Sequence, residues 1–547
     1  MSHPADMNFV LRKESSHVQE STLVDSPVGS TFKDVSECDV PVDQMPLLPP
    51  PTRHRSRTLV LCFDGTGDQF DMDNSNIVQF FSLLYKADRS RQMVYYQAGI
   101  GTYTTPQIAT PFVSKISKAL DEAIAWNLHA HVMGGYEFLM QNYKHGDRIC
   151  IFGFSRGAYT ARSLAGMIHK VGLLPACNHQ QVPFAYKMYI TDDKDGWKQS
   201  NAFKQTFSID VDIEFVGVWD TVNSVGLVPK GLPFSRSNTM VRTFRHAISL
   251  DEHRAKFKPN LWTKTSERDM LGLSEARRTR PRWYHSISHA HGNGKDHDGK
   301  DEKQHNGKEE KPSQRALERK YSECLAEPTD VEEVWFSGCH CDVGGGSVSN
   351  DTPHNLARIP LRWMVRECFK TDSGIMFDTE GLRKIGLDPT ALYPEVKERP
   401  PALSAESERI QAIPKPTKKK PATSEPLSPL THDHPAIPTD DDPCLSEEEH
   451  DLHDALSPIY DQLRLKWFWW ILEVVPLRQR HRRSEKTWQK LHFGVNMGRG
   501  RCVPNSKQGE GVKVHRSVRT RLEAEMEGGG KYMPKAELDL EKVVWVD

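Results

Sequence analysis

The sequence of 547 residues lacks several features that would assign it at once to a class of protein. No apolar run reaches the ~18 residues that a membrane-spanning helix needs. The opening stretch, MSHPADMNFVLRKESSHVQE, has no apolar core like that of a secretory signal peptide. The formal net charge is only -1, so no charge excess points to nucleic acid. We therefore expect a soluble protein of the cytoplasm without a nucleic-acid partner.

Paired cysteines are also absent. The ten cysteines are scattered singly and form no C-x-x-C motif, which argues against a disulfide framework or a zinc ribbon and suits a reducing compartment. Cys339, His340 and Cys341 are adjacent, but zinc ligands normally come from separated pairs. The sequence therefore predicts no metal site, and no motif calls for an organic cofactor.

The composition of the sequence changes along the chain and divides it into segments that are expected to be ordered or disordered. Residues 1–55 are polar and rich in proline, and they predict a disordered tail. Order is expected over residues 56–393, interrupted by a disordered insertion at about 277–320 that is rich in histidine, glycine and lysine. Residues 394–450 have the composition of a second disordered linker. Residues 451–547 are expected to form a mainly helical segment that closes the folded domain.

Short apolar runs alternate with longer helical patterns in the first part of this domain. The runs TLVLCF, RQMVYYQAG, RICIFGF and IEFVGVW are typical of buried strands, and ALDEAIAWNLHAHVMGGYEFLMQNY has helical periodicity. This alternation indicates a mostly parallel sheet with crossover helices on both faces. The predicted fold class is therefore α/β.

The stretch GFSRGAYTAR contains the pattern G-x-S-x-G directly after the predicted strand RICIFGF. A helical pattern follows, so the context is that of a nucleophile turn in an α/β-hydrolase. Gly153 and Gly157 relieve steric crowding in such a tight turn, and Ser155 between them is the candidate nucleophile. The alternative is that Ser155 only caps the following helix, as serine often does.

A nucleophilic serine needs a base, and that base needs an orienting acid. In α/β-hydrolases these follow the nucleophile in the order acid, histidine, each after a later strand. Asp220 ends the apolar run IEFVGVW, and His340 follows EVWFSGC and precedes three glycines. His515 and His246 are alternative bases, and His246 is expected in a helix. Asp342 is an alternative acid, but it is better placed to hold the glycine loop.

Two donors must stabilise the negatively charged oxygen of the intermediate. One should be the backbone N–H of Arg156, after the nucleophile. The other should come from LCFDGTGD, where Gly65, Thr66 and Gly67 can turn amides toward the oxygen and Asp64 can hold the turn. The same stretch lacks the first aspartate of the D-x-D-G-T motif of haloacid-dehalogenase phosphatases, and it lacks the G-K-[ST] of a nucleotide P-loop.

Seven motifs, in order, resemble one family: FDGTGD, NSNIVQF, YYQAGIGT, GFSRGAYTAR, VGVWDTV, RHAISLDEHR and WFSGCHCDVGGG. They are similar to the α/β-hydrolase catalytic domain shared by bacterial type VI secretion phospholipase effectors and uncharacterised fungal proteins. The resemblance spans about residues 58–370. It implies that Ser155, Asp220 and His340 form a triad, and that the protein is an esterase or phospholipase working through an acyl-enzyme. A catalytically idle hydrolase fold that binds other proteins is the alternative.

The segment WFWWILEVVPL combines three tryptophans with aliphatic residues and is followed by the basic RQRHRR. Such a stretch suits a helix on a membrane surface, with rings at headgroup depth and arginines near anionic lipid. A peripheral membrane contact through residues 467–483 is therefore one prediction, beside an ester or phospholipid substrate. The other, which we favour, is a buried helix that covers the core or roofs the pocket.

Overall fold

The computed structural model describes residues 41–51, 56–99, 113–222, 231–263, 314, 317–318, 328–406, 408–413, 445–479, 482–484, 487–488, 492–503 and 511–547. The side chains of residues 113–127 and 477–493 are not among those described. The segments predicted to be disordered lie largely outside the described residues: the tail except residues 41–51, nearly all of the insertion at 277–320, and residues 414–444 of the linker.

A parallel sheet forms the centre of the fold. Within the described residues it has eight strands, in the order β16-β14-β7-β6-β5-β4-β2-β3, and every neighbouring pair is parallel. In chain order the strands are β2 Thr58–Phe63, β3 Gln92–Gln97, β4 Arg148–Phe154, β5 Ile213–Trp219, β6 Val241–Ser249, β7 Asp330–Phe336, β14 Val512–His515 and β16 Val543–Val546. The α/β fold predicted from the sequence is confirmed.

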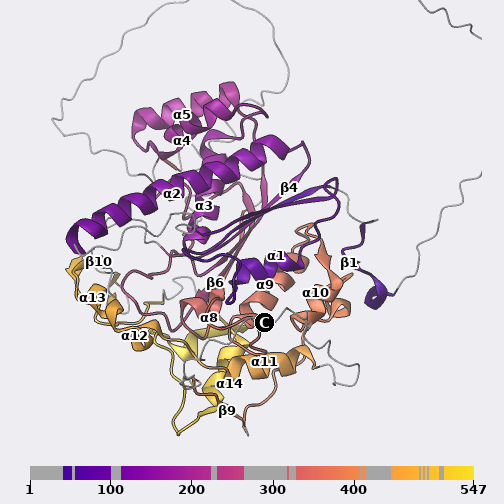
Figure 1. The fold of residues 1–547 in the computed structure, drawn as a ribbon, viewed down its shortest axis with the longest axis vertical. Coiled ribbons are helices and arrows are strands. Elements are labelled where there is room, and N and C mark those ends of the chain that lie inside the picture. The colour runs from indigo at the N-terminus through magenta and orange to yellow at the C-terminus, as the bar shows by residue number, and fades with distance from the viewer. Residues whose placement is uncertain are drawn as a thin grey trace, which may run out of the picture. The chain divides into compact units, whose positions relative to one another are not determined.

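Helices cover both faces of the sheet (Figure 1). On one side lie α2 Val113–Asn142, α3 Ser155–Val171, α4 Val182–Ile190 and α5 Lys194–Phe207, and on the other lie α1 Asn76–Leu83 and α9 Arg358–Lys370. Strands buried on both faces are mostly apolar along their length, which explains the continuous apolar runs of β2, β4 and β5.

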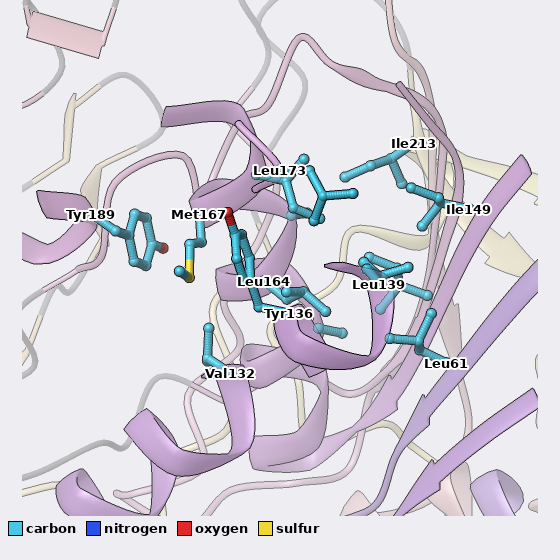
Figure 2. Packing of buried hydrophobic residues seen from close by; sticks show 14 of the residues in the cluster. Leu61, Val132, Tyr136, Leu139, Ile149, Leu164, Met167, Leu173, Tyr189 and Ile213 are labelled. Atoms are coloured by element: carbon cyan, nitrogen blue, oxygen red, sulfur yellow. The ribbon is translucent and has the colours of Figure 1, made fainter. Parts of the chain in front are cut away.

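Alternate side chains of each strand enter two different cores. Leu59, Leu61 and Phe63 of β2 pack with α2, α3 and α4, whereas Val60 and Cys62 pack with α1 and α9. Figure 2 shows the first core, in which residues from α2 and α3 gather beside residues from the sheet: Tyr136, Leu139, Leu164, Leu61 and Ile149. Burial of both faces therefore holds the sheet rigidly between two layers of helices.

The end of the chain contributes strands as well as helices. β14 pairs with β7, and β16 pairs with β14, so the segment 451–547 extends the sheet of the preceding domain. Its helix α14 Arg516–Glu523 packs against α11 Glu447–Leu456, which in turn packs against α9. Part of the expected linker also pairs: β9 Arg409–Ile410 lies beside β15 Glu525–Met526. Residues Val42–Asp547 accordingly form one compact unit.

No helix in the described part of the chain has the length and apolar character needed to cross a membrane.

Candidate active site

The candidate residues follow strands that end at the same edge of the sheet. Ser155 begins α3 directly after β4, Asp220 follows β5, and His340 begins the short helix α8 His340–Gly344 after β7. Because the strands are parallel, their carboxyl ends lie together, and this edge is where α/β folds bind ligands. Three side chains that are far apart in the sequence are thereby brought into one place.

Ser155, His340 and Asp220 form a continuous chain of hydrogen bonds. His340 Nε2 lies 2.8 Å from Ser155 Oγ, and His340 Nδ1 lies 2.5 Å from Asp220 Oδ2. All three residues are buried. In this arrangement the imidazole can accept the hydroxyl proton on one nitrogen while donating its other N–H to the carboxylate.

The backbone at Ser155 has a conformation that is uncommon for a residue with a side chain. Its φ is +57°, in the left-handed region, and Asp220 has a φ of +39°. Such conformations cost energy and gather at functional sites. Ser155 is the first residue of α3, the cap position belongs to Phe154, and no side chain caps this helix end. The alternative role of Ser155 as a helix cap therefore disagrees with the geometry.

The two glycines of G-x-S-x-G allow very close backbone approach. A Cβ at Gly157 would lie 2.3 Å from the carbonyl oxygens of Phe63 and Asp64, and a Cβ at Gly153 would lie 2.5 Å from the Gly157 oxygen. Real Cβ atoms do not come this close to backbone. These glycines thus let the start of α3 touch the end of β2, which brings the loop after β2 beside Ser155.

Arg501 holds the carboxylate of Asp220 with both ends of its guanidinium group. Nη1 donates to Oδ1 at 2.5 Å, Nη2 donates to Oδ2 at 2.8 Å, and the backbone N–H of Ser249 adds a third bond at 3.0 Å. Burial alone would raise the pKa of Asp220, but the charge of Arg501 and the hydrogen bonds from His340 and Arg501 hold it well below its usual range. Asp220 is therefore ionised although it is buried.

The same guanidinium donates to the backbone oxygens of Ser249 and Phe257. Sequence reasoning missed Arg501 because no local motif marks it in GRGRCVPN.

The imidazole of His340 lies between two phenyl rings. Its ring centroid is 4.7 Å from that of Phe154 and 4.9 Å from that of Phe257. Burial lowers the pKa of His340 below its ordinary value; Asp220 opposes this shift and the charge of Arg254 adds to it. His340 is therefore neutral near pH 7, and the neutral form is the one that can accept a proton.

The loop after β2 is held by Asp64, as the sequence predicted. Asp64 accepts hydrogen bonds from Ser75 Oγ at 2.6 Å, from Tyr96 at 2.8 Å and from the N–H of Gly65 at 2.8 Å. The Gly65 N–H is thus already engaged inside the loop, which weakens its candidacy as an oxyanion donor. Thr66 Oγ1 is buried and has no hydrogen-bond partner among the described residues. The hydroxyl of Thr66 is therefore a better candidate donor than the amide of Gly65.

Comparison with known proteins places the chain in a family. Residues 57–367, more than half of the chain, match the family described as T6SS phospholipase effector Tle1-like, catalytic domain. The chain belongs to this family. It is an ester-hydrolysing enzyme with a hydrolase-like α/β fold, as the resemblance of the seven motifs implied.

Individual relatives were found among both fungal and bacterial proteins. Uncharacterized protein YEL023C of Saccharomyces cerevisiae is 29% identical over 560 residues, which cover 86% of this chain and 80% of the yeast protein. A crystal structure of an uncharacterized protein from Pseudomonas aeruginosa is 18% identical with a TM-score of 0.31, over 62% of this chain and 49% of that one. The Tle1 effector bound to the VgrG spike is 16% identical with a TM-score of 0.23, over 37% and 47%.

This chain therefore spans about half the length of these two solved structures. Because both TM-scores are low, neither structure carries an argument beyond the family match.

Asp342, in the glycine motif of the family, holds its own loop and does not contact His340 as an acid would. Its carboxylate accepts from the N–H of Cys339 at 2.9 Å, from Ser347 Oγ at 2.9 Å and from the N–H of Tyr460 at 3.0 Å. Burial raises the pKa of Asp342 to about 7. Within the described structure it thus acts on the shape of the loop, the role that the sequence favoured for it.

The alternative histidines have other partners in the described structure. His515 stacks on Phe336 with ring centroids 5.0 Å apart and bonds to Ser517 at 2.9 Å. His246 was expected in a helix, and this is wrong: it lies in β6, where Nδ1 is 2.9 Å from Glu333 Oε1 and Nε2 accepts from the N–H of Thr221. Hydrogen bonds with Glu333 and the N–H of Thr221 satisfy the buried side chain of His246, so the strand tolerates a pattern that looks helical.

The segment WFWWILEVVPL is not a buried helix, so the burial that we favoured for it is wrong, whereas its position over the pocket stays a prediction. It forms the short turn Trp467–Trp469, then α13 Trp470–Glu473, and leads into β10 Leu477–Gln479. Trp467 is 77% exposed and Ile471 is 51% exposed. The acidic side chain of Glu473 faces inward, at 1% exposure. The side chains of the following RQRHRR lie outside the described residues.

Proposed function

We propose that this enzyme is a serine hydrolase that cleaves carboxylic esters of lipids, including phospholipids, through an acyl-enzyme. The observation that carries the proposal is the 2.8 Å separation between Ser155 Oγ and His340 Nε2, on a turn with left-handed backbone. Membership of a family described by its phospholipase effectors supports a lipid ester as the substrate class.

In the first half of the reaction, Ser155 Oγ attacks the ester carbonyl carbon while His340 Nε2 takes the hydroxyl proton. The oxygen of the tetrahedral intermediate carries a negative charge. The N–H of Arg156 and the N–H groups of Thr66 and Gly67 are the proposed donors for it, with Thr66 Oγ1 as the added candidate, since the N–H of Gly65 is bound to Asp64. His340 then returns its proton to the leaving alcohol, and the acyl group remains on Ser155.

In the second half, water attacks the acyl group while His340 takes a proton from the water. Collapse of this second intermediate releases the fatty acid and restores Ser155. Asp220 accepts the Nδ1–H of His340 throughout, and it stabilises the imidazolium that forms twice in each cycle. No step in this scheme calls for a metal ion or an organic cofactor.

Arg501 brings the end of the chain into the same site. We propose that residues 56–393 form the catalytic domain and that residues 451–547 close it, because the guanidinium of Arg501 binds Asp220. A peripheral membrane contact through residues 467–483 belongs to the same proposal, since a lipid ester has to be reached at a membrane surface.

The test is hydrolysis by the purified full-length protein. Short p-nitrophenyl esters and mixed phospholipid vesicles are offered to the wild type and to the Ser155→Ala and His340→Gln variants. Ser90→Ala, at an exposed serine, is the matched control. We expect the wild type and the control to release acid from at least one substrate and both site variants to lose it. Activity that persists in Ser155→Ala would show that Ser155 is not the nucleophile. A folded wild type inactive on every ester would favour the idle, protein-binding alternative.

A further inference from the structure

Nine exposed apolar side chains form what we call the aromatic face: Leu465, Trp467, Phe468, Trp470, Ile471, Val474, Val475, Val495 and Met497. They come from two segments that lie together, because the N–H groups of Asn496 and Met497 both donate to the backbone oxygen of Glu473. Soluble proteins rarely expose a contiguous apolar patch of more than a few hundred Å² unless it binds something. The aromatic face therefore has the composition of an interaction surface.

Glu473 fixes the orientation of this face. Its carboxylate accepts hydrogen bonds from the N–H of Ala255 at 2.6 Å, from Asn496 Nδ2 at 2.5 Å and from the N–H of Gly498 at 2.9 Å. These bonds turn the one carboxylate of α13 into the protein. The neighbouring apolar side chains are consequently left pointing outward from a well-anchored backbone.

The exposed charges of the segment 461–476 have one sign. Within residues 461–476, both acidic side chains are buried: Glu473 under α13, and Asp461 against His253. The cations Arg464 and Lys466, by contrast, are exposed. Exposed aromatic and aliphatic side chains with exposed cations in the same segment match the interface of a bilayer with anionic headgroups.

A short chain of ring contacts joins this face to the candidate site. The ring of Trp469 is 5.6 Å from that of Phe257, and Phe257 in turn contacts the ring of His340 at 4.9 Å. The guanidinium carbon of Arg254 lies 3.6 Å from the centre of the Phe257 ring and 4.7 Å from that of Trp469. The segment that carries the aromatic face is thus part of the wall around His340.

We propose that the aromatic face docks the protein on an anionic phospholipid surface and so delivers membrane esters to Ser155. The delivery rests on the function proposed above, whereas docking is a separate property. Docking uses the described residues 464–475 and 495–497, so it does not depend on the basic run RQRHRR.

Docking is measured by co-sedimentation with vesicles, using the full chain with Ser155→Ala so that the lipid stays intact. Vesicles of phosphatidylcholine with phosphatidylserine are compared with phosphatidylcholine alone. We expect binding to the anionic vesicles. Trp467→Ser combined with Ile471→Ser should weaken this binding about tenfold or more, because two large side chains no longer insert. Phe207→Ser, an equally exposed apolar side chain on α5, should bind like the parent.

A charge reversal, Arg464→Glu with Lys466→Glu, should weaken binding to anionic vesicles and leave binding to neutral ones nearly unchanged. Unaltered binding by the Trp467→Ser, Ile471→Ser variant would overturn the proposal. A second outcome would also overturn it. If the parent binds no vesicles but self-associates in light scattering, and the variant does not self-associate, then the aromatic face joins two copies of the chain.

The same pair of substitutions in the active protein separates docking from catalysis. Hydrolysis of a soluble p-nitrophenyl ester should be unchanged, since neither side chain lies in the catalytic machinery, while vesicle hydrolysis should fall with vesicle binding. If Ser155→Ala binds vesicles but the wild type cleaves no ester, docking stands and the proposed function fails. If the wild type cleaves soluble esters but no variant binds vesicles, docking fails alone.

Discussion

Arg501 binds both carboxylate oxygens of Asp220, from a position 281 residues further along the chain. Both side chains are fully buried. The segment that carries Arg501 also carries the strand β14, so the end of the chain completes both the sheet and the candidate site. An ionised acid next to His340 would otherwise be costly to bury, because an unpaired buried charge is strongly destabilising.

Replacing Arg501 by methionine should therefore lower both activity and stability. Removing one partner of a buried ion pair costs about 3–5 kcal/mol of unfolding free energy. Activity should fall further than stability explains, because without Arg501 the pKa of Asp220 rises and the acid limb of the pH profile moves upward. Urea unfolding and kcat/KM against pH measure the two effects. Arg499→Met, at an exposed arginine two residues earlier, should change neither, and an unshifted acid limb in Arg501→Met would contradict the role.

The pH dependence of the wild type follows from the groups around His340. The proposed reaction needs a neutral imidazole, and burial lowers the pKa of His340 below its ordinary value of 6.5. Asp220 stays ionised over the same range, because its pKa lies below the ordinary 3.8. We expect kcat/KM on a soluble ester to be constant near pH 7 and to fall on acidification with a midpoint below 6.5. A midpoint above 6.5 would mean that Asp220 outweighs burial.

Gly157→Ala tests the close approach of α3 and β2. The added methyl group would meet the backbone oxygens of Phe63 and Asp64 at 2.3 Å, and backbone cannot rotate away as a side chain can. Overpacking of this kind costs about 1–3 kcal/mol, and the displaced loop should also reduce kcat. Gly231→Ala is the control, since a Cβ there would meet no atom of the described residues within 4 Å. Equal kcat in both variants would show that the loop after β2 is not needed for catalysis.

Arg362 ties the closing segment to the catalytic domain. From α9 it donates to Asp451 and Asp454 of α11, each at 2.6 Å, and all three side chains are largely or wholly buried. Burial would raise the pKa of both carboxylates, but the charge of Arg362 outweighs it and lowers them. Carboxylates of this kind stabilise the fold above their unfolded pKa, and the stabilisation disappears as the pH falls through the folded pKa.

Arg362→Met should accordingly lose about 3–5 kcal/mol of unfolding free energy near pH 7. Its stability should also fall less steeply than that of the wild type as the pH drops below about 4. Urea unfolding at several pH values measures both. Lys384→Met, which breaks an exposed pair with Glu380, is the control and should change little. If the unfolding free energies of Arg362→Met and the wild type fell equally with pH, the ion pairs of Arg362 would not be the source of this pH dependence.

Much of the fold could be read from short apolar runs. TLVLCF, RICIFGF and IEFVGVW coincide with β2, β4 and β5, because strands buried on both faces leave a continuous apolar signal. The sequence did not predict β6, because this strand lacks a continuous apolar run. It carries Arg245 and His246, which are buried with Glu367 and Glu333 as partners, and such pairing cannot be seen in a local pattern.

The candidate site was predictable only where a residue follows a strand. Ser155, Asp220 and His340 each do, and the structure brings them within hydrogen-bond distance. Arg501 follows no strand and belongs to no motif, so its contact with Asp220 depends on how the whole chain folds. The exposure of Trp467 was also unpredictable, because composition favours burial while the inward hydrogen bonds of Glu473 decide which side chains face outward.

The most direct test of Ser155 as an activated nucleophile is labelling by a fluorophosphonate probe, which needs no knowledge of the substrate. Purified wild type, Ser155→Ala and Ser90→Ala are treated with the probe, and the modified peptide is identified by mass spectrometry. We predict labelling of wild type and Ser90→Ala on the peptide that contains Ser155, and none of Ser155→Ala. Labelling that survives in Ser155→Ala, or a folded wild type that takes up no probe, would contradict the assignment of Ser155 as the nucleophile.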